Sequence, residues 1–76
     1  MKLSETPLNN DVIVIEVDKT LKNYRRFLEM GLLKNSQLSV VMKTPLNDII
    51  VVQIDSYLLA MRKEDSSKII VRKILC

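Results

Sequence analysis

The sequence predicts a small, mainly β fold: an antiparallel barrel of about five strands with one short α-helix. Five short runs rich in β-branched and other apolar residues occur within 76 residues, and such runs are typical of strands. One other segment repeats its apolar residues at intervals of three and four, as a helix does. The connections are too short for the crossovers of a parallel sheet, so the strands are predicted to be antiparallel. Closing such a sheet into a barrel also hides its edges.

Turn-forming residues separate the five predicted strands. Only Asp55 and Ser56 lie between the third and the fourth strand, which is the spacing of a tight hairpin. Residues 64–67, ahead of the last strand, leave room for one short helical turn. The strands are predicted at Asp11–Val17, Gln37–Met42, Asp48–Ile54, Tyr57–Arg62 and Lys68–Ile74.

The helix is predicted from about residue 21 to residue 30, with Thr20 or Asp18 as its N-cap. Its charged residues fall on the other side and are expected to be solvated. The apolar face is formed by Leu21, Tyr24, Leu28 and, as a further candidate, Phe27.

The chain has a single glycine, Gly31, directly after this helix. A helix often ends on a left-handed residue whose amide reaches back to the last carbonyl groups, and glycine adopts that conformation without a Cβ clash. We therefore predict that Gly31 is a structural C-cap with positive φ and that Leu32 packs back on the last turn.

Composition excludes several classes of function. The apolar fraction of 47% is ample for the core of one domain covering residues 1–76. The only cysteine is Cys76 and there is no histidine, so an internal disulfide, the commonest catalytic base and the usual zinc ligand sets are missing. One glycine cannot build a phosphate-binding loop. No catalytic site, metal site or cofactor is predicted, and the protein is expected not to be an enzyme.

The order of several segments resembles the FeoA family of bacterial ferrous iron transport proteins. They are VIVIEV at 12–17, RRFLEMGLLKNSQLSVV at 25–41, TPLNDIIVVQI at 44–54 and YLLAMRKEDSSKIIV at 57–71. The resemblance implies an SH3-like barrel and a small, cytoplasmic, non-enzymatic accessory protein that binds the iron transporter FeoB. Any association with a transition metal is implied only by the family.

Three positions depart from the family pattern at turns where glycine is usual: Asn35, Asn47 and Ser56. Asparagine is the commonest non-glycine residue in left-handed geometry. We therefore predict positive φ at Gly31, Asn35 and Asn47. Serine is less suited to it, which leaves the type of the hairpin turn at Ser56 open.

The predicted partner-binding surface combines charge, a helix end and a rigid turn. The alternative for each of its residues is a purely structural or solvated role. The residues are Arg25, Arg26, Glu29, Met30 and Lys34.

Composition also bears on other classes of partner, namely nucleic acids and membranes. A net charge of +3 is mild, and aromatic residues are too few for a base-stacking platform, so no nucleic acid is expected. The N-terminal segment does not resemble a signal peptide and no apolar run is long enough to span a bilayer, so no membrane insertion is expected. The alternatives are an SH3-like accessory domain of a metal-dependent transcription regulator, a weak nucleic-acid binder, or a homo-oligomer formed through an exposed strand or the barrel surface.

Overall fold

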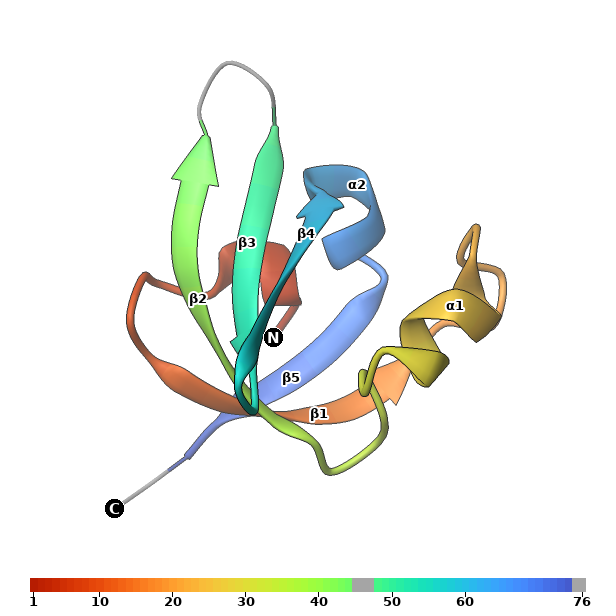
Figure 1. The fold of residues 1–76 in the computed structure, drawn as a ribbon, viewed down its shortest axis with the longest axis horizontal. Coiled ribbons are helices and arrows are strands. Elements are labelled where there is room, and N and C mark those ends of the chain that lie inside the picture. Colours follow the sequence, from red (N-terminus) through yellow and green to blue (C-terminus); the bar gives the residue numbers. More distant parts are fainter. Residues whose placement is uncertain (45–47, 75–76) are drawn as a thin grey trace.

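A twisted five-stranded antiparallel sheet forms the body of the molecule, as the sequence predicts (Figure 1). The computed structural model describes residues 1–44 and 48–74. Neighbouring strands in the sheet follow the order β4-β3-β2-β1-β5. The strands are β1 (Asp11–Val17), β2 (Gln37–Thr44), β3 (Ile49–Ile54), β4 (Tyr57–Arg62) and β5 (Ile69–Lys73).

The core lies on the concave face of the sheet and follows the two-residue period of a strand. In β3, for example, Ile50, Val52 and Ile54 are buried while the residues between them are more exposed. Leucines from the non-strand segments complete the core. The buried apolar residues are Leu3, Val12, Val14, Leu21, Phe27, Leu32, Leu38, Val40, Ile50, Val52, Ile54, Leu59, Met61, Ile69 and Val71.

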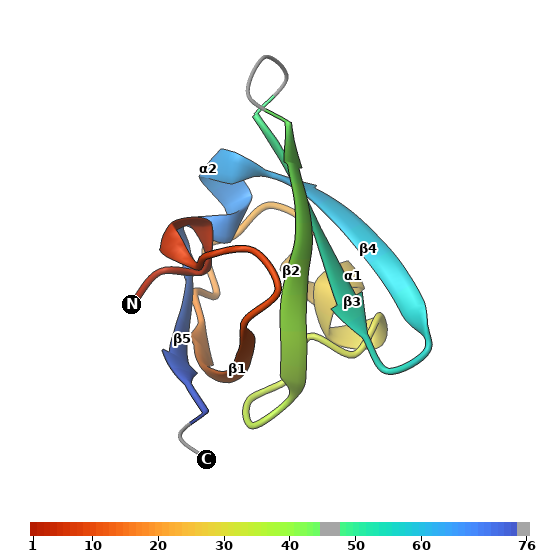
Figure 2. The same cartoon turned by 90° about the vertical axis from the view of Figure 1, so that its left-hand side faces the viewer.

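Two irregularities bend the sheet toward a barrel. The register shifts between Val14 and Glu16 in the β1–β5 pair and between Val40 and Met42 in the β2–β3 pair. An extra residue on one strand increases the local twist and bends that strand. The curled sheet is visible from the side in Figure 2.

The end strands β4 and β5 are joined by a helix rather than by a strand ladder. Among residues 1–44 and 48–74, no pairing connects β4 to β5. The short helix α2 (Lys63–Ser66) spans the distance between them, one residue before the helical turn predicted at 64–67 (Figure 1). The barrel is therefore incomplete at this seam, and the expectation that closure hides both edges does not hold.

The N-terminal segment covers the outer edge of β5. Backbone groups of Met1 and Val71 exchange two hydrogen bonds, of 2.7 and 3.0 Å. Lys2 forms an isolated bridge with Ile70, and Leu3, at the start of the 3-10 helix η1 (Leu3–Glu5), is fully buried. This edge thus has a backbone partner from the same chain.

The helix α1 (Tyr24–Glu29) is shorter than predicted and begins differently. Its N-cap is Asn23, in left-handed geometry with φ of 66° and no side-chain capping bond, so Thr20 and Asp18 are wrong as caps. The Asp18 carboxylate instead accepts bonds from the amide and hydroxyl of Thr20, at 2.8 and 2.7 Å. This local bond favours a turn over a helix, which delays the start of α1.

The C-terminal end of α1 agrees with the prediction for Gly31. Its φ is +97°, its amide donates to the Leu28 carbonyl at 3.1 Å, and the Leu32 amide donates to the Phe27 carbonyl at 3.0 Å. These two bonds form a Schellman cap. Leu32 is fully buried behind it.

Of the other turns discussed from the sequence, the structure describes those at residues 35 and 56. Asn35 has φ of 74°, as expected, whereas Asn47 lies outside the described residues. The two-residue β3–β4 hairpin is present, but its left-handed residue is Asp55, with φ of 54°, and not Ser56. Each non-glycine residue with positive φ in residues 1–44 and 48–74 is Asn or Asp, whose short polar side chains tolerate this geometry best.

Candidate functional site

The helix α1 is a ridge between two grooves. Side chains three and four apart on a helix lie on the same face. Tyr24 and Leu28 face one groove, whereas Asn23, Phe27 and Met30 face the other.

The first groove, here called the lysine groove, has a volume of about 970 Å³ and lies between α1, β1 and β5. Its floor is apolar and half-buried, formed by Ile15, Val17, Tyr24, Leu28 and Ile70. Its charged lining residues are Lys19, Lys34 and Lys68, with Glu16 and Asp18.

One carboxyl group in the lysine groove is electrostatically perturbed. The amide and the hydroxyl of Thr20 donate to Asp18 and lower its pKa below the ordinary value, and Lys68 lowers it further. Hydrogen bonds to a carboxylate favour its charged form. Asp18 therefore offsets part of the positive charge of this groove at neutral pH.

The second groove, here called the edge groove, has a volume of about 460 Å³ and lies between α1 and β4. Consecutive residues of β4, from Leu58 to Arg62, line it. Side chains alternate between the faces of a strand, so consecutive residues can line one groove only where the groove runs along the strand's edge. Asn23, Arg26 and Met30 line the side formed by α1.

The turn after α1 lies close to the Tyr57 side chain at the start of β4. The hydroxyl of Tyr57 lies so near Gly31 that a Cβ at this position would be 2.6 Å from it. Glycine therefore leaves room for the Tyr57 hydroxyl in addition to adopting positive φ, and the sequence indicated only the second of these properties.

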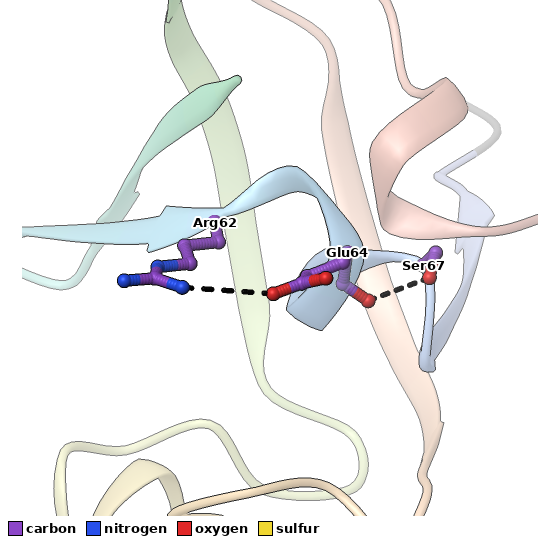
Figure 3. A network of polar contacts seen from close by, with 3 residues as sticks. All are labelled: Arg62, Glu64 and Ser67. Carbon is purple, nitrogen blue, oxygen red and sulfur yellow. Dashed lines mark hydrogen bonds and ion pairs between the residues drawn. The ribbon is translucent and has the colours of Figure 1, made fainter. Parts of the chain in front are cut away.

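At the other end of β4, Arg62 forms an ion pair with Glu64 of α2, with 3.7 Å between Nη1 and Oε1 (Figure 3). The hydroxyl of Ser67 donates to the Glu64 carbonyl at 2.6 Å. Both charged side chains are 75% exposed, and ion pairs this exposed contribute little to stability. The Arg62 guanidinium is consequently available to other carboxylates.

The residues of the predicted partner-binding surface do not share one groove. Arg26 and Met30 line the edge groove, whereas Lys34 lines the lysine groove. Arg25 and Glu29 are exposed on α1 and line neither of these two grooves. Met30 is half-buried and packs against the core, so only part of its side chain is accessible.

The contribution of β4 to this region was not predicted from the sequence. Leu58 is 63% exposed, more than any other large apolar side chain in residues 1–44 and 48–74. A signal was present, because the run YLLAM is apolar at every position, and alternation then places apolar residues on the outer face too.

Neither a cluster of metal ligands nor a membrane-spanning helix occurs among the described residues. In the part of the chain that the structure describes, no three His, Cys, Asp or Glu side chains are grouped as metal ligands would be. None of the helices in residues 1–44 and 48–74 has the length and apolar character needed to cross a bilayer.

Comparisons with known proteins agree on one family. A family model described as FeoA domain matches residues 1–73. A curated relative from Porphyromonas gingivalis, an Fe(2+) transport protein A/Fe(2+) transporter FeoB fusion protein, is 32% identical over 69 residues. These residues are 91% of this chain, and the chain spans only 8% of that relative's length.

Two solved structures have the same fold. FeoA from Chlorobium tepidum is 31% identical, with a TM-score of 0.86 over 99% of this chain and 71% of that one. FeoA from Stenotrophomonas maltophilia, a procaryotic SH3 domain protein solved with zinc, is 28% identical, with a TM-score of 0.79 over 95% of this chain and 89% of that one. The predicted SH3-like fold is thereby confirmed.

Proposed function

The chain belongs to the FeoA domain family, and from this premise we propose that it is a non-enzymatic accessory protein of bacterial ferrous iron uptake. It acts by binding a FeoB-type transporter on the cytoplasmic side, and residues 1–76 work as one domain. The observation that carries this proposal is the relative in which an Fe(2+) transport protein A and a FeoB transporter are fused. Fusion keeps two partners at high effective concentration, which supports a functional contact between them.

The surface proposed for this contact is the exposed side of α1 with the turn that follows. Its charged members, Arg25, Arg26 and Glu29, project from a helix held rigidly by the cap at Gly31. Met30 adds a partly accessible apolar side chain, and Lys34 extends the surface toward the lysine groove. Charged side chains around a small apolar centre are typical of protein interfaces.

A pull-down with the FeoB-type transporter of the same organism tests this surface. The double variant Arg25→Glu with Arg26→Glu reverses two exposed charges, and we expect it to weaken association about tenfold or more, because mismatched charge disfavours a docked complex. The matched control is Arg72→Glu with Lys73→Glu, which makes the same change at exposed positions of β5. Equal binding by wild type and both double variants would remove α1 from the interface.

A further inference from the structure

We propose that the free edge of β4 binds an extended acidic peptide segment, which lies in the edge groove and joins the sheet as a sixth strand. This deepens the proposed function, because it gives the chemistry of the segment that is bound. It rests on the proposed function only for the identity of the protein that carries the peptide. The proposal is carried by the juxtaposition of an unpaired strand edge, an adjoining groove and two arginines.

The register of the β3–β4 hairpin shows which backbone groups are free. Ile54 pairs with Tyr57 across a two-residue turn, so these two residues exchange backbone hydrogen bonds. The backbone amide and carbonyl groups of successive residues along β4 then point alternately toward β3 and away from it. Those of Leu58, Ala60 and Arg62 point away from β3. Across the described residues, no backbone or side-chain hydrogen bond outside the strand ladders uses the groups of Leu58 or Ala60.

The two edges of the sheet differ in how they are protected. The edge of β5 is covered by Met1 and Lys2. The β3–β4 pair keeps an unbroken register from end to end, whereas two of the other pairs contain a shift. Natural proteins usually protect edges with bulges, prolines, lysines or a covering segment, and residues 57–61 contain no proline and no charge. The edge of β4 is thus a regular template for another strand.

The groove beside this edge has the lining that such a strand needs. An added strand would lie about 4.8 Å from β4, with α1 on its other side. One face would contact Phe27 and Met30, and the other would lie beside Leu58 and Ala60. Alternate apolar residues are therefore expected in the peptide, as in other cases of strand addition.

The charges at the groove favour acidic residues at the remaining positions. Arg26 lines the groove from α1 and Arg62 lines it from β4, against a single carboxylate, Asp65. The ion pair of Arg62 with Glu64 is exposed to solvent and is therefore easily exchanged for another carboxylate. A second copy of this chain is disfavoured, because its own β4 edge, residues 57–62, has no carboxylate to place opposite these arginines.

The test uses the whole protein, labelled with ¹⁵N, and a nine-residue capped peptide of alternating valine and glutamate. Two matched peptides separate the contributions: one with lysine in place of glutamate, and one with N-methyl groups on the amides of one edge. The readouts are the dissociation constant from NMR titration and the hydrogen-exchange protection of the Leu58 and Ala60 amides.

We expect the acidic peptide to bind and to protect the Leu58 and Ala60 amides. The lysine peptide and the N-methylated peptide should each bind about tenfold more weakly or worse, since the first lacks charge complementarity and the second lacks main-chain donors. Equal binding of the acidic and N-methylated peptides, or protection elsewhere, would overturn strand addition. Protection of these amides that increases with protein concentration and without peptide would assign the edge to a second copy and overturn the proposal too.

Two variants test the same point from the protein side. Ala60→Pro removes an outward amide, a position where an edge strand tolerates proline, and should reduce affinity for the acidic peptide about tenfold. Arg62→Glu should do the same, whereas the control Lys43→Glu, on β2, should not. No transporter is present in these measurements, so their failure leaves the pull-down result standing, and failure of the pull-down leaves the peptide result standing.

Discussion

Gly31 has two roles that can be separated by mutation. Its φ of +97° is strained for any residue with a Cβ, and its Cα faces the Tyr57 hydroxyl. We expect Gly31→Ala to lower the free energy of unfolding by about 1–2 kcal/mol, mostly because the alanine backbone is strained at this positive φ. The Tyr57 side chain is 39% exposed, so its hydroxyl can move away at little cost. Chemical denaturation of wild type and variant measures the difference.

The contribution of the close contact follows from a double-mutant cycle with Tyr57→Phe, which removes the hydroxyl and keeps the ring. Gly31→Ala should cost a few tenths of a kcal/mol less in the Tyr57→Phe background than in wild type. An identical cost in both backgrounds would mean that the hydroxyl imposes no constraint on residue 31.

Asp18 gives the stability a defined pH dependence. Because the pKa of this carboxyl is lowered in the folded protein, its stabilising contribution is complete above its ordinary value of 3.8 and is lost as the pH falls through the lowered value. Thr20→Val removes the hydroxyl donor and keeps the backbone amide, so it should raise the pKa part of the way back. An NMR titration of the carboxyl carbon measures this change.

Lys68→Gln is the control for that titration. The charge of Lys68 is a smaller cause of the lowered pKa than the bonds from Thr20, so this variant should raise the pKa of Asp18 by less than Thr20→Val does. The opposite ranking would show that long-range charge, and not the turn at residues 18–20, sets the ionisation of Asp18.

At the scale of the element, the side of α1 that faces the sheet determines which of its side chains are buried. Phe27 is 8% exposed and belongs to the core, while Leu28 is half-buried in the lysine groove. Phe27→Ala should therefore lower the free energy of unfolding by about 3–5 kcal/mol. Leu28→Ala should cost less than about 1.5 kcal/mol because little core volume is lost. Equal losses in urea denaturation would contradict the observed orientation of the helix.

The elements also differ in how far their bounds could be predicted. β1 and β4 agree with the prediction to the residue, because β-branched and apolar runs end there at turn-forming or charged residues. The start of α1 was predicted three residues too early. The apolar spacing extends back to Leu21, but the turn formed by Asp18 and Thr20 and the left-handed Asn23 interrupt the helix. The three- and four-residue spacing of apolar side chains reflects burial, and Leu21 is buried although it is not part of the helix.

For the whole molecule, the fold could be predicted and the grooves could not. Strand number, antiparallel order and the cap at Gly31 depend on local patterns and short connections. The edge groove depends on how α1 lies relative to β4, where Gly31 faces Tyr57, and on the incomplete seam at α2. Neither feature has a local signature, so Arg26 was identified as an interaction residue without its counterparts Leu58 and Arg62.

The mild net charge of the molecule distinguishes a protein partner from a nucleic acid. The net charge is only +3, and the two grooves are lined by three lysines and two arginines respectively, so few cations in either groove can meet one phosphate backbone. The proposed binding to a FeoB-type transporter should weaken by less than about tenfold between 50 and 200 mM salt. A protein that neutralises six to ten phosphates loses roughly 10³–10⁵ in affinity over that range by counterion release. Titration of duplex DNA under the same conditions is the control, and DNA binding with a steep log-linear salt dependence would favour the alternative of a nucleic-acid binder.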